Sequence, residues 1–121
     1  MSHKKVLIID DDPRNIFALT ATLKSRSYNC ISSLSATEAI DILKAENDIA
    51  VILIDMMMPE MDGYDAIPLI KALPHYQKTP IVAVTAQAML GDQEKCLEAG
   101  ADYYISKPID VDKLLTILKS V

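Results

Sequence analysis

The chain has 121 residues, of which 50% are hydrophobic and 24% are charged, and its formal net charge is −5. This composition is typical of one globular domain and excludes a disordered segment. The acidic balance, without a stripe of lysine or arginine, argues against direct binding of nucleic acid or of an anionic membrane surface.

The two cysteines and the N-terminal sequence indicate in which cellular compartment the protein is expected. Cys30 and Cys96 lie far apart and match no zinc pattern, so we expect both to be reduced, inert thiols. The N-terminus lacks the long apolar region of a signal peptide, and no apolar stretch approaches the ~18 residues of a membrane span. We therefore expect a cytoplasmic protein.

Short strand-like runs alternate with segments of helical period along the whole chain. The strands are expected at residues 6–9, 29–33, 49–54, 80–85 and 103–106. Several of these runs are wholly apolar, as expected where helices cover both faces of a parallel sheet. The most apolar run, 49–54, is expected at the centre of the sheet. The alternation predicts a single doubly wound α/β domain over residues 1–121.

The beginnings of three helices are marked by polar residues. Asp12 is expected to cap the first helix, with Pro13 at its first position. Ser35 and Glu38 have the spacing of a capping box, in which each side chain satisfies one unpaired amide of the helix start. Asp110 is expected to cap the last helix, which carries apolar residues at helical spacing.

For the third helix the informative residue is an interior proline, and for the fourth helix it is a glycine at the end. The third helix is expected near residues 64–73, where Pro68 removes a hydrogen bond and clashes with the preceding turn. The sequence leaves open whether this helix starts late, near Ile67, or kinks at the proline. The fourth helix is expected to end near Ala99, with Gly100 in a left-handed stop position.

Five polar residues follow or end the predicted strands: Asp10, Asp11, Asp55, Thr85 and Lys107. The carboxyl ends of parallel strands meet at one edge of a sheet, where ligands bind, so these side chains are expected to converge on one cleft. Three neighbouring carboxylates repel one another unless they are protonated, paired or bound to a cation. Hard oxygen ligands of this kind suit Mg²⁺.

Carboxylates that hold magnesium, beside a hydroxyl and an ammonium that hold phosphoryl oxygens, indicate a phosphoryl-transfer site. An aspartate can itself be the nucleophile, and the central strand position favours Asp55 for that part. Other chemistries are disfavoured. The chain has only three glycines, so it contains neither a Walker loop nor a dinucleotide fingerprint. A pair of acids that cleaves glycosides stays conceivable, although the sequence shows no aromatic-rich sugar cleft.

Four motifs, in this order and spacing, resemble the receiver domain of two-component response regulators: VLIIDDDP, ILIDMMMPEMDG, VAVTA and DYYISKP. The resemblance covers essentially the whole chain. It implies a flavodoxin-like (βα)5 fold with strand order 2-1-3-4-5. The PEMDGYDAI and KCLEAGADYYISKPID stretches are closer to the receivers of hybrid histidine kinases.

The resemblance also implies a role for each site residue. Asp55 corresponds to the phosphoacceptor. Asp10 and Asp11 correspond to the acidic pair that holds Mg²⁺ together with Asp55, and Met57 to the residue whose backbone carbonyl completes the coordination. Asp12 is better interpreted as a helix cap than as a ligand.

Three further positions follow from the resemblance. Thr85 and Lys107 correspond to the hydroxyl and the ammonium that bind the phosphoryl oxygens. Tyr104 corresponds to a switch aromatic, whose ring turns inward when the threonine moves toward the phosphate. Pro108 matches a position where a cis bond helps to aim the lysine.

The expected function is therefore a signalling switch, not an enzyme. A histidine kinase or histidine phosphotransfer protein would phosphorylate Asp55 in the presence of Mg²⁺, and slow autodephosphorylation would follow. Two alternatives stay open: a binding module that works without phosphorylation, and a small metal-dependent phosphatase. The chain is expected to be either a stand-alone regulator or a receiver from a longer protein such as a hybrid kinase. Its output partner is not indicated.

Overall fold

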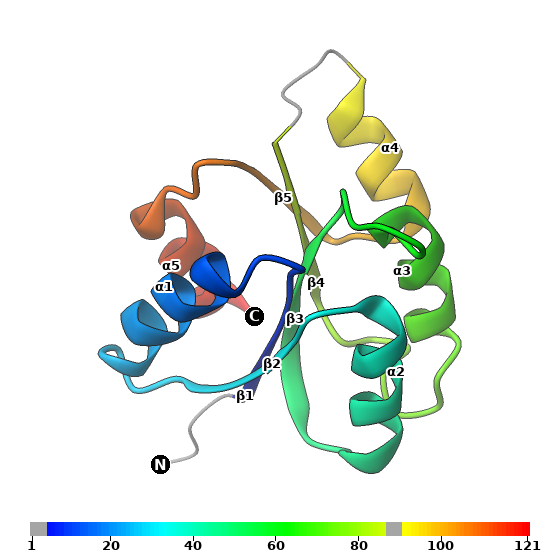
Figure 1. The fold of residues 1–121 in the computed structure, drawn as a ribbon, viewed down its shortest axis with the longest axis horizontal. Helices are drawn as coiled ribbons and strands as arrows, with labels where there is room; N and C mark the ends of the chain where they lie inside the picture. The colour runs from blue at the N-terminus through cyan, green and yellow to red at the C-terminus, as the bar shows by residue number, and fades with distance from the viewer. Residues whose placement is uncertain (1–4, 87–90) are drawn as a thin grey trace.

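The computed structural model describes residues 5–86 and 91–121, in which strands and helices alternate as predicted (Figure 1). The strands are β1 Lys5–Ile9, β2 Asn29–Ser33, β3 Ile49–Asp55, β4 Ile81–Thr85 and β5 Tyr103–Ser106. The helices are α1 Pro13–Lys24, α2 Ala36–Ala45, α3 Gly63–Lys71, α4 Asp92–Ala99 and α5 Val111–Ser120. Each predicted strand is present, within one residue of its expected bounds.

The five strands form one parallel sheet in the order β2-β1-β3-β4-β5. This is the flavodoxin-like order that the resemblance implies, and the most apolar strand, β3, lies at the centre. In the register, Asp55 pairs with Val84 and Thr85 pairs with Ser106. The carboxyl ends of β3, β4 and β5 therefore lie at the same edge of the sheet.

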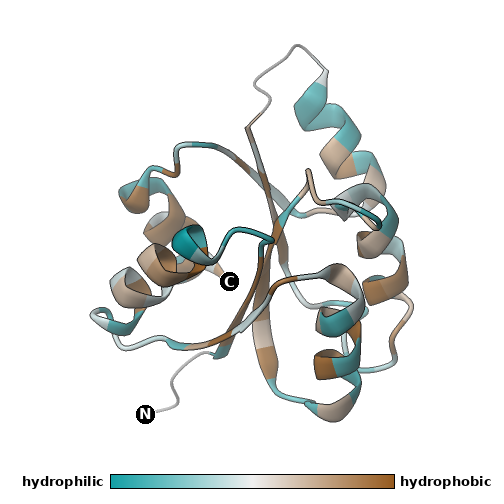
Figure 2. Ribbon diagram, in the orientation of Figure 1, coloured by the Kyte–Doolittle hydropathy of each residue, from teal (hydrophilic) through white to brown (hydrophobic). Residues whose placement is uncertain are grey.

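Two helical layers cover the sheet, with α1 and α5 on one face and α2, α3 and α4 on the other (Figure 1). Side chains of each strand alternate between the two layers. In β1, for example, Val6 and Ile8 belong to the core beside α1 and α5, whereas Leu7 and Ile9 belong to the core beside α2 and α3. Figure 2 shows the hydrophobic residues on the strands and on the inner sides of the helices. Burial on both faces explains why the inner strands β1, β3 and β4 are almost wholly apolar, whereas the edge strand β2 is more polar and more exposed.

The helix caps predicted for α1 and α2 are present, with one difference. The Asp12 carboxylate accepts a hydrogen bond from the Arg14 N–H at 2.9 Å, and Pro13 is the first residue of α1. The Ser35 hydroxyl accepts from the Glu38 N–H at 3.1 Å. The Ser35 N–H, however, donates to the Ser33 hydroxyl at 3.4 Å, so a serine at the end of β2 supplies the acceptor that the capping box assigned to Glu38.

Helix α3 begins at Gly63 and contains Pro68 in its interior, so the late start near residue 67 is wrong. Two contacts fix the early start. The Asp62 carboxylate accepts from the Asp65 N–H at 3.0 Å, which caps the helix. Gly63 packs against Met56, and a Cβ at position 63 would lie 2.9 Å from the Met56 Cα. The cap and this close packing compensate for the proline, which lacks an N–H group.

The remaining helix boundaries also follow the sequence signals. Gly100 ends α4 with a φ of 117°, and the Asp110 carboxylate caps α5 by accepting from the Lys113 N–H at 3.3 Å. Cys30 and Cys96 are free thiols. No helix within residues 5–86 and 91–121 combines the length and the apolar character needed to cross a membrane.

Candidate functional site

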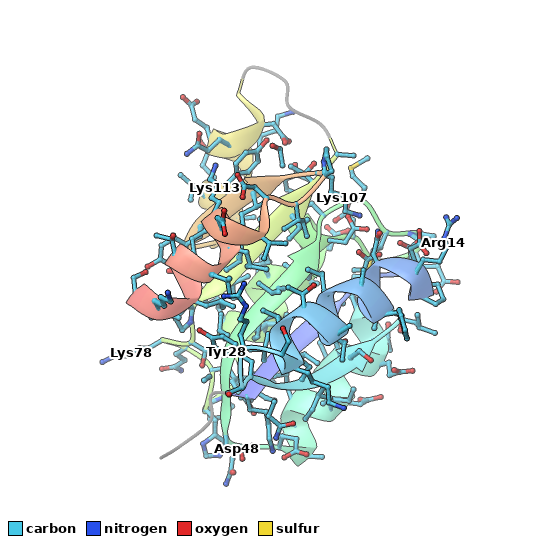
Figure 3. All side chains as sticks on the ribbon, turned by 90° about the vertical axis from the view of Figure 1, so that its left-hand side faces the viewer. Arg14, Tyr28, Asp48, Lys78, Lys107 and Lys113 are labelled. Carbon is cyan, nitrogen blue, oxygen red and sulfur yellow. The ribbon has the colours of Figure 1, made fainter. Side chains whose placement is uncertain are left out.

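The five residues at the strand ends lie at the carboxyl edge of the sheet, as predicted. Asp10 and Asp11 follow β1, Asp55 ends β3, Thr85 ends β4, and Lys107 follows β5. Figure 3 shows Lys107 at this edge, close to the first turn of α1. The sheet topology thus brings together side chains that are up to 97 residues apart in the sequence.

Asp10 is 4% exposed, and its carboxylate is held from several sides. One oxygen accepts from the Asp12 N–H at 2.9 Å. The other accepts from the Asn15 side-chain amide and from the Lys107 ammonium, each at 3.4 Å. The contact from Asn15 comes from the first turn of α1 and was not singled out from the sequence. These donors fix the orientation of a carboxylate that is otherwise removed from water.

Asp55 is also 4% exposed. Its Oδ1 accepts from the Met57 N–H at 3.0 Å, and its Oδ2 lies 3.4 Å from the Lys107 Nζ. Burial raises the pKa of Asp55 above its ordinary value, and the charge of Asp10 adds to this effect. The Met57 N–H and the Lys107 ammonium act in the opposite direction without cancelling the increase. The ionised form of Asp55 is therefore short of compensating positive charge.

Lys107 lies between the two buried carboxylates, at 3.4 Å from each. Burial opposes its charged form, but the charges of Asp10 and Asp55 outweigh burial and raise the pKa of the ammonium. Lys107 is thus a fixed cation at neutral pH. Its N–H donates to the Thr85 carbonyl at 2.7 Å, and its peptide bond to Pro108 is cis, as the resemblance implies.

Asp10, Asp11 and Asp55 each offer a carboxylate oxygen, and these oxygens lie within 4.8 Å of one another. Two of the residues are buried and Asp11 is exposed, so the group opens to solvent on one side. Three carboxylates against the single ammonium of Lys107 leave a formal charge of −2 in this cluster. An oxygen-only ligand set of this charge fits a hard divalent cation such as Mg²⁺.

Asp12 does not join this group, because its carboxylate caps α1 and pairs with Arg14 at 3.1 Å. Figure 3 shows Arg14 pointing outward from the start of α1. The interpretation of Asp12 as a helix cap is therefore confirmed. Met57 lies in the loop after β3 with its side chain exposed.

Thr85 and Tyr104 lie on neighbouring strands. Thr85 is fully buried at the end of β4. The ring of Tyr104 packs against the core on the α2, α3 and α4 face, and its hydroxyl donates to Asp92 at 3.3 Å. Tyr64 donates to the same carboxylate at 2.8 Å. Sequence reasoning missed Asp92 and Tyr64, because neither lies at a strand end and their contact depends on how α3 packs against α4.

Sequence comparisons identify relatives of two kinds. A family model described as the response regulator receiver domain matches residues 6–119. The signal transduction histidine-protein kinase BarA of Escherichia coli (strain K12) is 40% identical over 113 residues, which cover 93% of this chain but only 12% of that kinase. The polar-differentiation response regulator DivK of Brucella ovis is 33% identical over 117 residues, which cover 97% of this chain and 94% of DivK.

Solved structures of receiver domains superpose on the fold. The chemotaxis protein CheY4 of Vibrio cholerae has a TM-score of 0.92 at 25% identity, and the match covers 99% of both chains. The receiver domain of a sensor histidine kinase from Pseudomonas aeruginosa PAO1, described with a magnesium ion coordinated in its active-site cleft, has a TM-score of 0.89 at 32% identity. That match covers 98% of this chain and 97% of the other. The chain therefore belongs to the response regulator receiver domain family.

Proposed function

We propose that this receiver domain is a magnesium-dependent phosphoacceptor and that Asp55 carries the phosphoryl group. The observation that carries the proposal is the environment of Asp55. Its carboxylate is buried beside two further aspartates, and one ammonium lies within 3.4 Å of it. This is an anionic nucleophile beside a cation, at the edge of the sheet where ligands bind.

Asp10, Asp11 and Asp55 would hold the metal ion, with the Met57 carbonyl as a further ligand. Bound there, Mg²⁺ would neutralise charge on the carboxylates and on the phosphoryl oxygens. The formal charge of −2 in the cluster supports this assignment, as does the similarity to a receiver domain described with magnesium in its cleft.

The side chains of the site would position the reacting groups. An Asp55 carboxylate oxygen attacks the phosphorus of a phosphohistidine, and the P–N bond breaks with its electron pair going to the imidazole nitrogen. The Lys107 ammonium, already 3.4 Å from Asp55, would bind a phosphoryl oxygen, and the Thr85 hydroxyl a second one. Catalysis of this kind consists of positioning and charge stabilisation.

Water would then attack the same phosphorus in line, which releases inorganic phosphate and restores the Asp55 carboxylate. The domain would thus assist its own phosphorylation and slow dephosphorylation without turning over a separate substrate, and it is in this sense a switch rather than an enzyme. Movement of Thr85 toward the phosphoryl group, together with Tyr104, would carry the signal.

The phosphodonor would be a histidine kinase or a histidine phosphotransfer protein, and the reaction would take place in the cytoplasm. The relatives include both a full-length regulator and a part of a much larger kinase. Accordingly, this single receiver domain, residues 1–121, would serve either as a regulator by itself or as the receiver of a longer kinase.

Phosphorylation by acetyl phosphate tests the proposal. With Mg²⁺, the wild-type protein should gain the mass of one phosphoryl group, and it should gain none when a chelator replaces the metal. Asp55→Asn should gain none under either condition, whereas Asp41→Asn, an exposed acid on α2, should behave as the wild type. An unmodified wild type, or equal modification of Asp55→Asn, would overturn the proposal.

The two rival functions give different results in the same samples. A binding module that works without phosphorylation would ignore beryllium fluoride and Mg²⁺, which mimic an aspartyl phosphate. A phosphatase would turn over free phosphate esters rapidly. We expect tight binding of beryllium fluoride and no such turnover.

A further inference from the structure

A buried carboxylate outside the phosphoacceptor cluster joins three elements of the fold. Asp92, the first residue of α4, is 5% exposed. Its Oδ1 accepts a hydrogen bond from the Tyr64 hydroxyl on α3 at 2.8 Å, and its Oδ2 accepts from the Tyr104 hydroxyl on β5 at 3.3 Å. Burial of a carboxylate is costly unless donors satisfy it, and here two tyrosine hydroxyls do so.

The contact to Tyr104 holds the polar end of the proposed switch residue. The Tyr104 ring packs against the core, and its hydroxyl reaches α4. Burial, and then the charge of Asp92, raises the pKa of Tyr104. The hydroxyl therefore stays protonated at neutral pH and acts as a donor to the carboxylate. This hydrogen bond links the position of Tyr104 to the start of α4.

The contact to Tyr64 orients the same carboxylate from the other side. Its hydroxyl also lies 3.8 Å from the Cys96 sulfur, one turn further along α4. Burial and the hydrogen bond to Asp92 raise the pKa of Tyr64, so this hydroxyl also stays a donor. With Oδ1 held from α3, the second oxygen is directed at β5. Tyr64 thus fixes the orientation of Asp92. The side-chain hydrogen bonds described for Tyr64 are to Asp92 and Cys96, and neither residue belongs to the phosphoacceptor cluster.

We propose that Asp92 is a positioning residue for Tyr104, and that Tyr64 orients Asp92 for this role. In this structure the Tyr104 hydroxyl is bound to Asp92 at the start of α4. If phosphorylation moves Tyr104, this hydrogen bond must break, or the start of α4 must move with the ring. The bond therefore opposes the phosphorylated arrangement, and its loss should favour that arrangement by about tenfold. This step rests on the proposed function, because it assigns Tyr104 the switch role.

The test combines two measurements on Asp92→Ala. In protein with tyrosine rings labelled with carbon-13, and without any phosphate mimic, the Tyr104 NMR signals should move toward their position in wild type saturated with beryllium fluoride and Mg²⁺. The affinity for beryllium fluoride should rise about tenfold. In a Tyr104→Phe background, Asp92→Ala should no longer change that affinity, because the effect passes through the tyrosine hydroxyl.

Two variants keep this test decisive. Glu94→Ala removes an exposed acid from the same turn of α4 and should match the wild type. Asp92→Asn keeps the side-chain shape but offers one acceptor oxygen, so it should shift the Tyr104 signals less than Asp92→Ala does. Unchanged Tyr104 signals in the folded Asp92 variants would overturn the proposal. A wild type that takes neither phosphate nor beryllium fluoride would overturn the proposed function. The role of Asp92 would then be decided by comparing the unliganded Tyr104 signals of the wild type, Asp92→Asn and Asp92→Ala, because that comparison needs no phosphate mimic.

Discussion

At Asp55, burial and the positive charge of Lys107 act in opposite directions on the pKa of the carboxylate. This carboxylate is removed from water and lies beside Asp10, and among the described residues the Met57 N–H and one shared ammonium compensate its charge. Burial raises its pKa. Between the ordinary pKa of an aspartate and this raised pKa, the folded protein binds more protons than the unfolded protein. The free energy of unfolding therefore falls as the pH rises through that interval.

Replacement of Asp55 should consequently stabilise the metal-free protein. At pH 7, Asp55→Asn should have a higher free energy of unfolding than the wild type, because a neutral amide avoids the cost of burying an ionised carboxylate. The difference should shrink as the pH falls through the raised pKa of Asp55, because the wild-type carboxyl then becomes neutral. Urea unfolding of both proteins in a chelating buffer measures this, with Asp41→Asn as an exposed control. A less stable Asp55→Asn at pH 7 would contradict the account of Asp55.

At the scale of the elements, Pro68 shows where local signals conflict. The proline lies in the interior of α3, and its missing N–H leaves the carbonyl of Tyr64, four residues earlier, without its usual helical donor. The helix forms because Asp62 caps it and because its inner face is buried, as shown by Ala66 and Ile67. Tertiary packing therefore decides the start of this helix.

Pro68→Ala should raise the free energy of unfolding by about 1–2 kcal/mol. The helical hydrogen bond that it restores outweighs the added freedom of the unfolded chain, which costs about 0.4–1 kcal/mol. Pro74→Ala, an exposed proline outside the helices, is the matched control and should be neutral or slightly destabilising. Denaturant unfolding compares the two. Equal effects of both substitutions would show that Pro68 does not weaken α3.

Elements marked by local chemistry were predictable, and contacts between distant elements were not. Strand bounds followed from apolar runs, and the caps at Asp12 and Asp110 followed from residue type. The capping-box pattern predicts that the Glu38 side chain accepts from the Ser35 N–H. In the structure the Ser33 hydroxyl is the acceptor, because Ser33 lies at the end of the preceding strand, a position that the pattern does not describe. The sequence does not determine the start of α3, since it depends on close packing of Gly63 against Met56.

At the scale of the whole molecule, the sheet topology assembles the site. Because all five strands are parallel, their carboxyl ends share one edge, and five polar residues from separate segments converge there. This convergence could be predicted from the strand ends alone. The hydrogen bond from Tyr64 to Asp92 joins two helices whose residues are 28 positions apart in the sequence. No helical or strand periodicity in the sequence relates these two positions. The cleft was therefore predictable, whereas the link from Tyr104 to α4 required the structure.

Chemical trapping of the phosphorylated residue tests the central claim most directly. Borohydride reduces an aspartyl phosphate to homoserine, so a peptide map of protein treated with acetyl phosphate and Mg²⁺ identifies the acceptor by its mass. The account predicts homoserine at position 55 alone, and none when a chelator replaces the metal. Homoserine at position 10 or 11, or a phosphate that resists borohydride on another side chain, would contradict the assignment of Asp55 as the phosphoacceptor.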